Sequence, residues 1–432
     1  MTSIPADGRH LLGFVIFVVV MALAIFRPRG IHEAWAAVGG AAAMLALGVV
    51  SPPDLLRVLE ETSGVLVFLL GMMAVAAVLD VAGVFEWAAS VALRLSRGSG
   101  RRLLVSVFVL GAVVTALLSL DVTVLMLTPV VYTTVVAHQI DALPYLYACT
   151  FVANTGSLLF PMSNLTNLLI VDGLKVPFWS YTAMMVVPDV AAVTTTVLVF
   201  LWVFRDRLPA QLDSMDRAWP DPPSDRFFRV AVGVCGLMLG GLFAAGLAGW
   251  PLWPVALGAG TVLVGAAWSI GRQDLRALGR RISWPLLPFV WGIASTVRGI
   301  QHAGLTQTLG RFVLGHAGGS LGSGLLIGTV SALGANVFTN VPMALVMLAA
   351  LHQLPPARIG LLAGAVLAGT NIGPAMTPVG SLATMLWLAF ARRQGVNVPV
   401  GDYLRVGALT VPCALAAALA TLFLQISLWG TR

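Results

Sequence analysis

The sequence predicts an all-α membrane protein with about ten transmembrane helices and two re-entrant hairpins, arranged as two inverted-topology repeats with paired broken helices. First, 58% of the 432 residues are hydrophobic and only 10% are charged, whereas soluble domains carry about a quarter charged residues. Second, apolar runs long enough to cross a ~30 Å hydrocarbon core recur along the whole chain. Third, residues that break helices recur at a nearly constant offset in the two halves.

Ten apolar segments are predicted to span the bilayer, five in each half of the chain. The first of them ends without the small-residue pattern of a signal-peptide cleavage site, so we expect it to be retained as a span. The segments are 11–26, 34–50, 64–84, 143–175, 181–204, 227–247, 252–270, 283–300, 357–391 and 403–428.

Two further apolar pairs, 103–138 and 320–352, are each interrupted midway by polar residues. The loop arginines decide the topology, because cytoplasmic loops carry an excess of basic residues. The segments 27–33, 94–102, 205–229, 271–281 and 392–405 hold 18 of the 25 basic residues and are predicted to face the cytoplasm. Ten spans then fit only if both pairs are re-entrant hairpins. The alternative topology, in which each hairpin arm crosses the membrane as a full span, stays open.

The two halves match each other in sequence. Phe68, Gly71 and Ala82-Gly83 match Phe289, Gly292 and Ala303-Gly304. Asn154, Gly156 and Pro161 match Asn371, Gly373 and Pro378. Asp121 matches Asn340. Five spans per half is an odd number, so the second copy must be inserted upside down, an arrangement typical of secondary transporters. We predict an N-terminal repeat (1–204, with spans 1–5 and hairpin 103–138), a cytoplasmic linker (205–226) and a C-terminal repeat (227–432, with spans 6–10 and hairpin 320–352).

The interrupted spans carry the candidate binding site. Non-helical backbone survives at membrane depth only inside protein or beside a water-filled cavity, and half-helix N-termini there add partial positive charge. The polar residues of both breaks and both hairpin tips can present donors and acceptors to a small solute. An alternative is that they only cap kinked helices or bond across helices. The predicted solute-binding residues are Ser119, Asn154, Thr155, Ser163, Asn164, Asn336, Asn340, Asn371, Thr377 and Ser381.

Asp121 is predicted to lie at a hairpin tip near the bilayer centre. A carboxylate at that depth is costly, so it should be functional or paired. Dry surroundings favour the neutral form and contact with water favours the ionised form, as a proton-coupling group requires. The alternative is a structural acid that is bonded to the neighbouring break. Asp80, Glu86, Asp189 and Arg298 fall nearer span ends, where interface solvation is expected, and Glu86 is expected on an amphipathic surface helix.

Several function classes are excluded or disfavoured. Lys175 is the only lysine, so a Gly-Lys-Ser/Thr phosphate loop is impossible, and we expect neither an enzyme nor a cofactor. The net charge of +7 lies in short loops, so nucleic acid is not an expected partner. Cys149, Cys235 and Cys413 lie far apart in apolar stretches, where buried thiols are expected. A three-thiolate site for a soft metalloid is kept as a minor alternative.

At these breaks the sequence resembles the arsenical pump membrane protein family of the ion transporter superfamily. The resembling segments are 151–157, 159–164, 373–384, 127–130 and 339–342. The resemblance implies a multi-pass protein of the inner (plasma) membrane. It further implies export of arsenite or antimonite as the hydroxide in exchange for protons, sometimes with a cytoplasmic ATPase subunit. The chain departs from the expected Asn-Asp pair at the first hairpin tip, where Ser119-Leu120-Asp121 stands.

Residue chemistry separates the candidate cargoes. A pocket of Asn, Ser and Thr without arginine suits a neutral trihydroxy solute such as arsenous acid, and silicic acid stays open on the same chemistry. A dicarboxylate carrier of the same superfamily would need compensating positive charge at the breaks. The leading alternative is a sodium/proton antiporter, for which Asp121 and backbone carbonyls would supply oxygen ligands. A channel or a purely structural membrane protein is disfavoured by the symmetric site with a titratable group.

Overall fold

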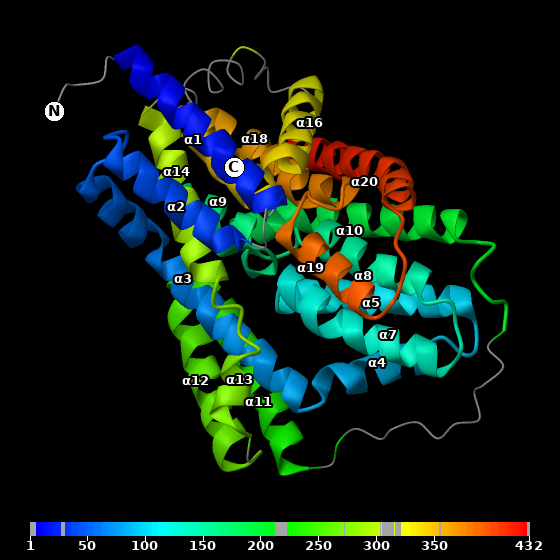
Figure 1. Cartoon of the computed structure of the whole chain (residues 1–432). Helices are drawn as coiled ribbons and strands as arrows, with labels where there is room; N and C mark the ends of the chain where they lie inside the picture. The colour runs from blue at the N-terminus through cyan, green and yellow to red at the C-terminus, as the bar shows by residue number, and fades with distance from the viewer. Residues whose placement is uncertain are drawn as a thin grey trace.

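The computed structural model describes residues 6–26, 31–211, 223, 225–271, 273–302, 304, 315, 321–353 and 356–429. Within these ranges the regular structure is entirely helical (Figure 1). The helices are α1 (Ala6–Phe26), α2 (Glu33–Ala46), α3 (Pro52–Val81), α4 (Val84–Leu95), α5 (Gly100–Leu117), α6 (Leu120–Val122), η2 (Thr123–Leu127), α7 (Thr128–Ala137), α8 (Leu143–Thr155), η3 (Pro161–Ser163), α9 (Leu165–Gly173), α10 (Phe178–Val203), α11 (Arg226–Ala248), α12 (Trp253–Ser269), α13 (Leu275–Gly279), α14 (Leu286–His302), α16 (Leu321–Phe338), α17 (Asn340–Leu351), α18 (Pro356–Ile372), η4 (Gly373–Met376), α19 (Leu382–Arg393) and α20 (Val400–Trp429).

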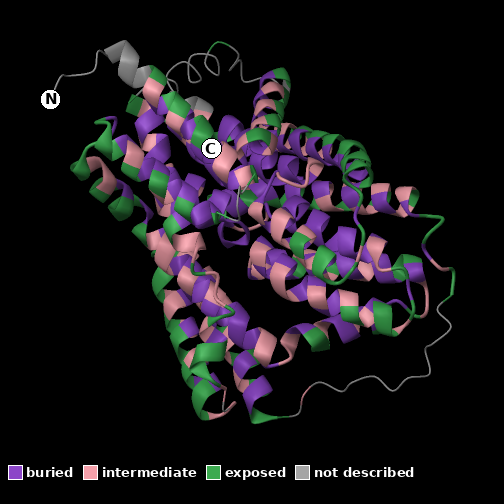
Figure 2. Cartoon of the chain, viewed as in Figure 1, coloured by how far each residue is buried: buried purple, intermediate pink, exposed green. Residues whose placement is uncertain are grey.

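The predicted all-α membrane fold is confirmed. Seven helices of the described ranges are long and apolar enough to cross a bilayer, and several shorter apolar helices accompany them. The predicted spans coincide with helices, and 143–175 and 357–391 are interrupted as expected. The largest difference is α3, which begins at Pro52 instead of near residue 64 because Ser51 and Asp54 form a capping box there. Leucines such as Leu198 and Leu237 are exposed, as expected of side chains that face lipid. Figure 2 shows exposed stretches along the outer helices and buried stretches where the helices pack together.

The helices pack around two hydrophobic cores, and each core takes helices from both halves of the chain. One is built mainly from α1 to α3 together with α11, α12 and α14. The other is built mainly from α5, α8 and α10 together with α16 to α20. Figure 1 shows α11, α12 and α13 gathered beside α3, away from the stack that contains α5, α7 and α8. Of the predicted linker 205–226, residues 212–222 and 224 lie outside the described residues, and the division into two repeats stays a prediction.

Equivalent helices of the two halves make equivalent contacts. α3 packs on α12, and its counterpart α14 packs on α2. At the first crossing a Cβ on Gly71 would lie 2.5 Å from the Ala256 carbonyl carbon, and at the second a Cβ on Gly292 would lie 2.6 Å from the Ala37 carbonyl carbon. Gly71 and Gly292 are one of the pairs that match in sequence. Their glycines therefore match because both allow two helix backbones to touch.

The course of α3 and α14 supports the predicted inversion. Glu61, early in α3, pairs with Arg298, late in α14, whereas Asp80, late in α3, pairs with Arg281, just before α14. The two helices therefore run antiparallel, as equivalent helices of inverted copies can. Asp80 and Arg298 were expected near span ends with solvation at the interface, and the structure adds that each forms a partly exposed ion pair between the halves.

Adding one methyl group at the crossing of α3 and α12 should prevent close packing. We expect Gly71→Ala to destabilise the protein by about 1–3 kcal/mol, because the new Cβ would meet backbone atoms that have no rotamer to adjust. Gly64→Ala on the same helix is the matched control, since its Cβ would meet only the Trp253 side chain at 3.5 Å. Yield and apparent melting temperature of the detergent-purified proteins check this. Equal values for the two variants would contradict the backbone contact.

Candidate functional site

The first break separates α8 from α9. α8 ends at Thr155, an irregular stretch follows, and α9 begins after Asn164, whose side chain accepts a hydrogen bond from the Thr166 amide at 3.1 Å. The backbone polar groups of this stretch are satisfied by side chains. The Leu158 amide donates to Asp189 Oδ1 at 2.8 Å, and Tyr181 donates to the Leu158 carbonyl at 2.8 Å. The chain can therefore remain non-helical inside the protein.

The second break separates α18 from α19. α18 passes into the short 3₁₀ turn η4, and α19 begins after Ser381, whose hydroxyl accepts from the Thr384 amide at 3.1 Å. Asn336 of α16 holds the break in place, because its amide donates to the Gly373 carbonyl at 2.8 Å. Thr377 in turn donates to Asn336 Oδ1 at 2.8 Å. The tip of the second hairpin and the second break therefore form one hydrogen-bonded unit.

The two breaks meet at Asn371. Its Oδ1 accepts from Ser157 at 2.8 Å and from Asn164 at 2.6 Å. Its amide donates to Asn167 Oδ1 at 3.0 Å and to the Leu367 carbonyl at 2.8 Å. All of these side chains are buried. A single asparagine of the second half thus binds three polar side chains of the first.

The contacts across the junction are themselves paired. Asn154, the counterpart of Asn371, donates to Thr384 at 3.4 Å, and Asn371 donates to Asn167 at 3.0 Å. Asn154 and Asn371 are separated by 217 residues, and so are Asn167 and Thr384. Each half therefore reaches the other with the same two positions. Among the described residues Asn154 Oδ1 is buried without a hydrogen-bond partner, so it is an acceptor available to a hydroxyl group.

The first hairpin, which carries Asp121, is hydrogen-bonded to the first break. Ser163, in the break, donates to the Ala116 carbonyl at 3.1 Å near the end of α5. Ser119 forms the turn and accepts from the Val122 amide at 3.4 Å. Asp121 follows in α6, half-buried, and among the described residues it makes no hydrogen bond or ion pair. It lies directly before the π-helical stretch η2, which packs on α19 of the other half, and π-helical turns often occur at functional sites.

The second hairpin tip is strained. Thr339 lies between α16 and α17 with φ +66° and ψ 166°, a region that costs a residue other than glycine about 1–3 kcal/mol. It places the buried Asn340 at the start of α17. Asn340 is the residue of the second half that matches Asp121 in sequence. The surrounding packing must hold this conformation, which makes the second tip a second point of precise positioning.

The predicted site residues fall into two groups. Asn154, Ser163, Asn164, Asn371 and Ser381 are buried at or beside the junction. Ser119, Asn336 and Thr377 are half-buried, and Asn340 is buried at its own tip. Thr155 is also buried, but its hydroxyl donates to the Phe151 carbonyl within its own helix at 2.9 Å, and among the described residues it makes no hydrogen bond to the second half.

Sequence reasoning missed several residues of the junction. Ser157, Asn167 and Thr384 were not among the candidates, although the shared offset of Asn167 and Thr384 could have identified that pair. Asp189 was expected near a span end in contact with the interface, which is wrong. It lies within α10, 5% exposed, and positions the first break through the Leu158 amide.

Asp189 should therefore act by accepting a hydrogen bond. We expect Asp189→Leu to lower stability by about 1–3 kcal/mol, because the buried Leu158 amide would lose its acceptor. Asp189→Asn keeps a carbonyl oxygen at this position and should retain most stability and transport. Thermal unfolding in detergent and vesicle transport of the two variants provide the measurement. Loss of transport in a well-folded Asp189→Asn protein would instead assign the residue a role in moving protons.

The three cysteines do not behave alike. Cys149 is buried as expected, Cys235 is half-buried, and Cys413 is exposed, so the expectation of three buried thiols is wrong for the last two. Within the described ranges no three His, Cys, Asp or Glu side chains lie close enough to hold a metal ion. The minor alternative of a three-thiolate site therefore has no support. Glu86 lies on α4, a separate surface helix with a strongly one-sided apolar face, as expected.

Interrupted helices that meet inside a bundle of apolar spans define the class, a multi-pass membrane transporter. The model of the family "Arsenical pump membrane protein" matches residues 12–426. The chain therefore belongs to the arsenical pump membrane protein family. Its apolar helices fit a multi-pass protein of the bacterial inner membrane.

Curated relatives agree with this assignment, and one solved structure shares the fold. The chain is 30% identical to an arsenical pump membrane protein of Escherichia coli over 96% of this chain and 99% of that protein. It is 32% identical to one of Yersinia enterocolitica, with the same coverage. The crystal structure of the Alcanivorax borkumensis YdaH transporter, described as having an unusual topology, matches with a TM-score of 0.61 at 16% identity, covering 98% of this chain and 99% of that one. This last likeness concerns the fold alone.

Proposed function

We propose that this transporter exports trivalent metalloid hydroxide, arsenite or antimonite, by proton antiport with alternating access. The observation that carries the proposal is the buried junction of Asn154, Asn164, Asn167, Asn371 and Thr384, to which both halves contribute. A trihydroxy solute offers donors and acceptors, and this junction offers both from uncharged side chains. The relatives named as arsenical pumps support the cargo.

The uncharged side chains of the junction favour a neutral cargo. Its side chains are amides and hydroxyls, and no arginine or lysine belongs to it within the described residues. An anionic dicarboxylate would need such a group, because an unpaired charge in a buried site is costly. Arsenous acid is uncharged near pH 7 and carries three hydroxyls. In this proposal one solute hydroxyl donates to Asn154 Oδ1, while a hydroxyl of the Ser381–Thr384 pair donates to a solute oxygen.

Asp121 is proposed to couple solute movement to protons. It lies beside η2, which contacts the second half, and has no cationic partner among the described residues. When the site opens to the cytoplasm Asp121 is ionised and the solute loads. After the solute leaves on the other side, Asp121 takes up a proton and the empty site returns. One proton per neutral solute moves one charge, so 100 mV supplies ~2.3 kcal/mol, roughly a 50-fold gradient.

Everted membrane vesicles test the proposal. Labelled arsenite should accumulate in vesicles that carry an inside-acid proton gradient, and a protonophore should abolish the accumulation. Arsenite uptake that persists after the gradient has collapsed would contradict antiport. Proton movement driven by sodium alone, without arsenite uptake, would favour the sodium/proton antiporter. Competition by silicic acid or by a dicarboxylate in the same vesicles tests the other cargoes, and added cytoplasmic ATPase subunit tests that partner.

A further inference from the structure

A cavity of about 400 Å³ opens between the two halves, away from the junction of the breaks. α3 and α9 of the first half form one part of its wall, and α14 and α17 of the second half form the rest. Its lining includes Glu61, Thr62, Leu169, Arg298 and Leu345, together with His352 just after α17. None of them belongs to the junction itself.

Two helices connect the cavity to the site. α9 starts at Asn164, which bonds to Asn371, and reaches the cavity wall at Leu169, about 7.5 Å further along its axis. α17 starts at Asn340 and reaches the wall at Leu345, over the same number of residues. The two helices pack against each other. The cavity therefore lies about one and a half helical turns from the polar residues that the proposed function uses.

The loop charges indicate on which side of the membrane the cavity opens. The basic loops predicted to be cytoplasmic include 271–281, and Arg281 of that loop pairs with Asp80 at one end of α3. Glu61 and Arg298 pair at the other end of α3, beside the cavity. Nineteen residues separate Glu61 from Asp80 in sequence, which is about 28 Å of helix and nearly the thickness of the hydrocarbon core. The cavity therefore opens on the side opposite the cytoplasmic arginines.

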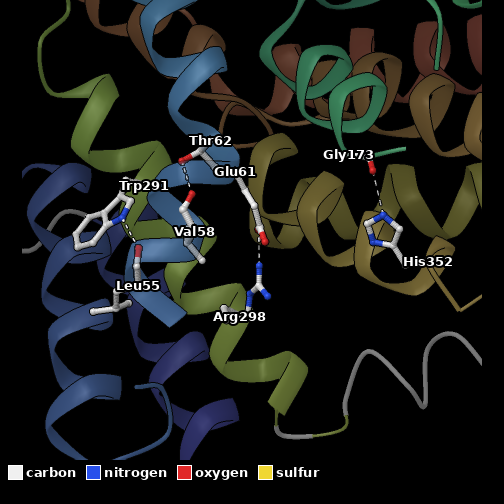
Figure 3. A network of polar contacts seen from close by, with 8 residues as sticks. All are labelled: Leu55, Val58, Glu61, Thr62, Gly173, Trp291, Arg298 and His352. Carbon is white, nitrogen blue, oxygen red and sulfur yellow. Dashed lines mark hydrogen bonds and ion pairs between the residues drawn. The ribbon is translucent and has the colours of Figure 1, made fainter. Parts of the chain in front are cut away.

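Two contacts close the cavity across the halves (Figure 3). The Glu61 carboxylate of α3 points toward the Arg298 guanidinium of α14. On the other wall the His352 ring, just after α17, is hydrogen-bonded at 3.2 Å to the Gly173 carbonyl at the end of α9. Each contact joins a helix of one half to a helix of the other. Movement of α14 away from α3, or of α17 away from α9, must break the corresponding contact.

We infer that this cavity is the outer mouth of the solute path and that the Glu61–Arg298 pair is its latch. The inference rests on the proposed function for the identity of the solute but not for the path. The cavity is lined by acidic and basic side chains, among them Glu61, Asp172 and Arg298, so it can hold water without favouring ions of one charge. Opening of the latch would let water reach from the rim toward Leu169 and Leu345, and from there to the junction.

Thiol labelling tests the side on which the cavity opens. In a protein whose three cysteines are replaced by alanine, Thr62→Cys should react with a membrane-impermeant methanethiosulfonate in right-side-out vesicles. Val81→Cys, at the other end of α3, is the matched control and should react only in everted vesicles. Labelling of Thr62→Cys from the cytoplasmic side alone, or from neither side, would overturn the inference.

A second variant tests the latch. Glu61→Gln in the Thr62→Cys protein should raise the labelling rate about two- to fivefold, as expected for loss of a partly solvated ion pair. Asp206→Asn removes an exposed pair with Arg205 elsewhere on the surface and serves as the control. An unchanged rate in Glu61→Gln would reject the latch. Labelling needs no solute, so a labelled mouth without arsenite transport would reject the proposed function alone, and arsenite transport without outside labelling would reject the mouth alone.

Discussion

Replacing Asp121 by Asn should abolish uphill export while the protein still folds and inserts. The amide has nearly the shape of the carboxyl group, and among the described residues Asp121 has no partner to lose, so stability should change by less than about 1 kcal/mol. In the proposed antiport, loss of this titratable group prevents exchange of a proton for solute, and the roughly 50-fold accumulation available from 100 mV should fall to equilibration.

Arsenite accumulation in everted vesicles measures this effect, with protein amount determined in the same membranes. Asp121→Glu is the matched control, since it keeps the carboxyl group and should retain partial coupling. Full proton-driven accumulation by Asp121→Asn would show that another group carries the proton. Loss of the protein from the membrane would assign Asp121 a structural role.

Replacing Asn371 by Ala should cost both stability and transport. The asparagine makes four hydrogen bonds, three of them to side chains of the first half. Their loss leaves Asn167 Oδ1 without this donor inside the protein and removes an acceptor from Ser157 and Asn164. We expect a loss of about 2–4 kcal/mol, because buried polar groups without partners are costly.

Asn154→Ala is the matched control on the other half. Asn154 donates two hydrogen bonds, one of them long, and its oxygen has no partner within the described residues. Its removal should lower the apparent melting temperature less than that of Asn371, yet raise the arsenite KM about tenfold if this oxygen accepts a solute hydroxyl. Equal loss of stability in both variants would contradict the asymmetry of the junction. An unchanged KM in Asn154→Ala would remove that residue from the site.

Much of the fold could be predicted because a membrane constrains sequence strongly. Spans follow from apolar length, and the breaks follow from Gly and Pro at matching offsets, as with Gly156 and Gly373. A similar offset matched Gly71 with Gly292, and the structure supplies the physical reason, which is backbone contact with α12 and α2.

The side-chain contacts could not be predicted in the same way. Asp189 is far in sequence from the break that it holds, and only the packing of α10 on the loop brings it to Leu158. The ion pair of Arg298 with Glu61 could not be predicted, because sequence gives no register between α3 and α14. Thr155 matched the pattern of a ligand, yet its hydroxyl is used within its own helix. A list of polar residues in a break therefore identifies the region of the site better than its members.

The central claim is that solute binds where the two breaks meet. Arsenic scatters anomalously at its K-edge, so diffraction from crystals of the protein grown with arsenite locates the atom without assuming a site. We predict an anomalous peak at the junction, close enough for the arsenite hydroxyls to hydrogen-bond to Asn154 Oδ1 and to the Thr384 hydroxyl. A peak at Cys149, or one confined to the outer cavity with none between Asn154 and Asn371, would contradict the account.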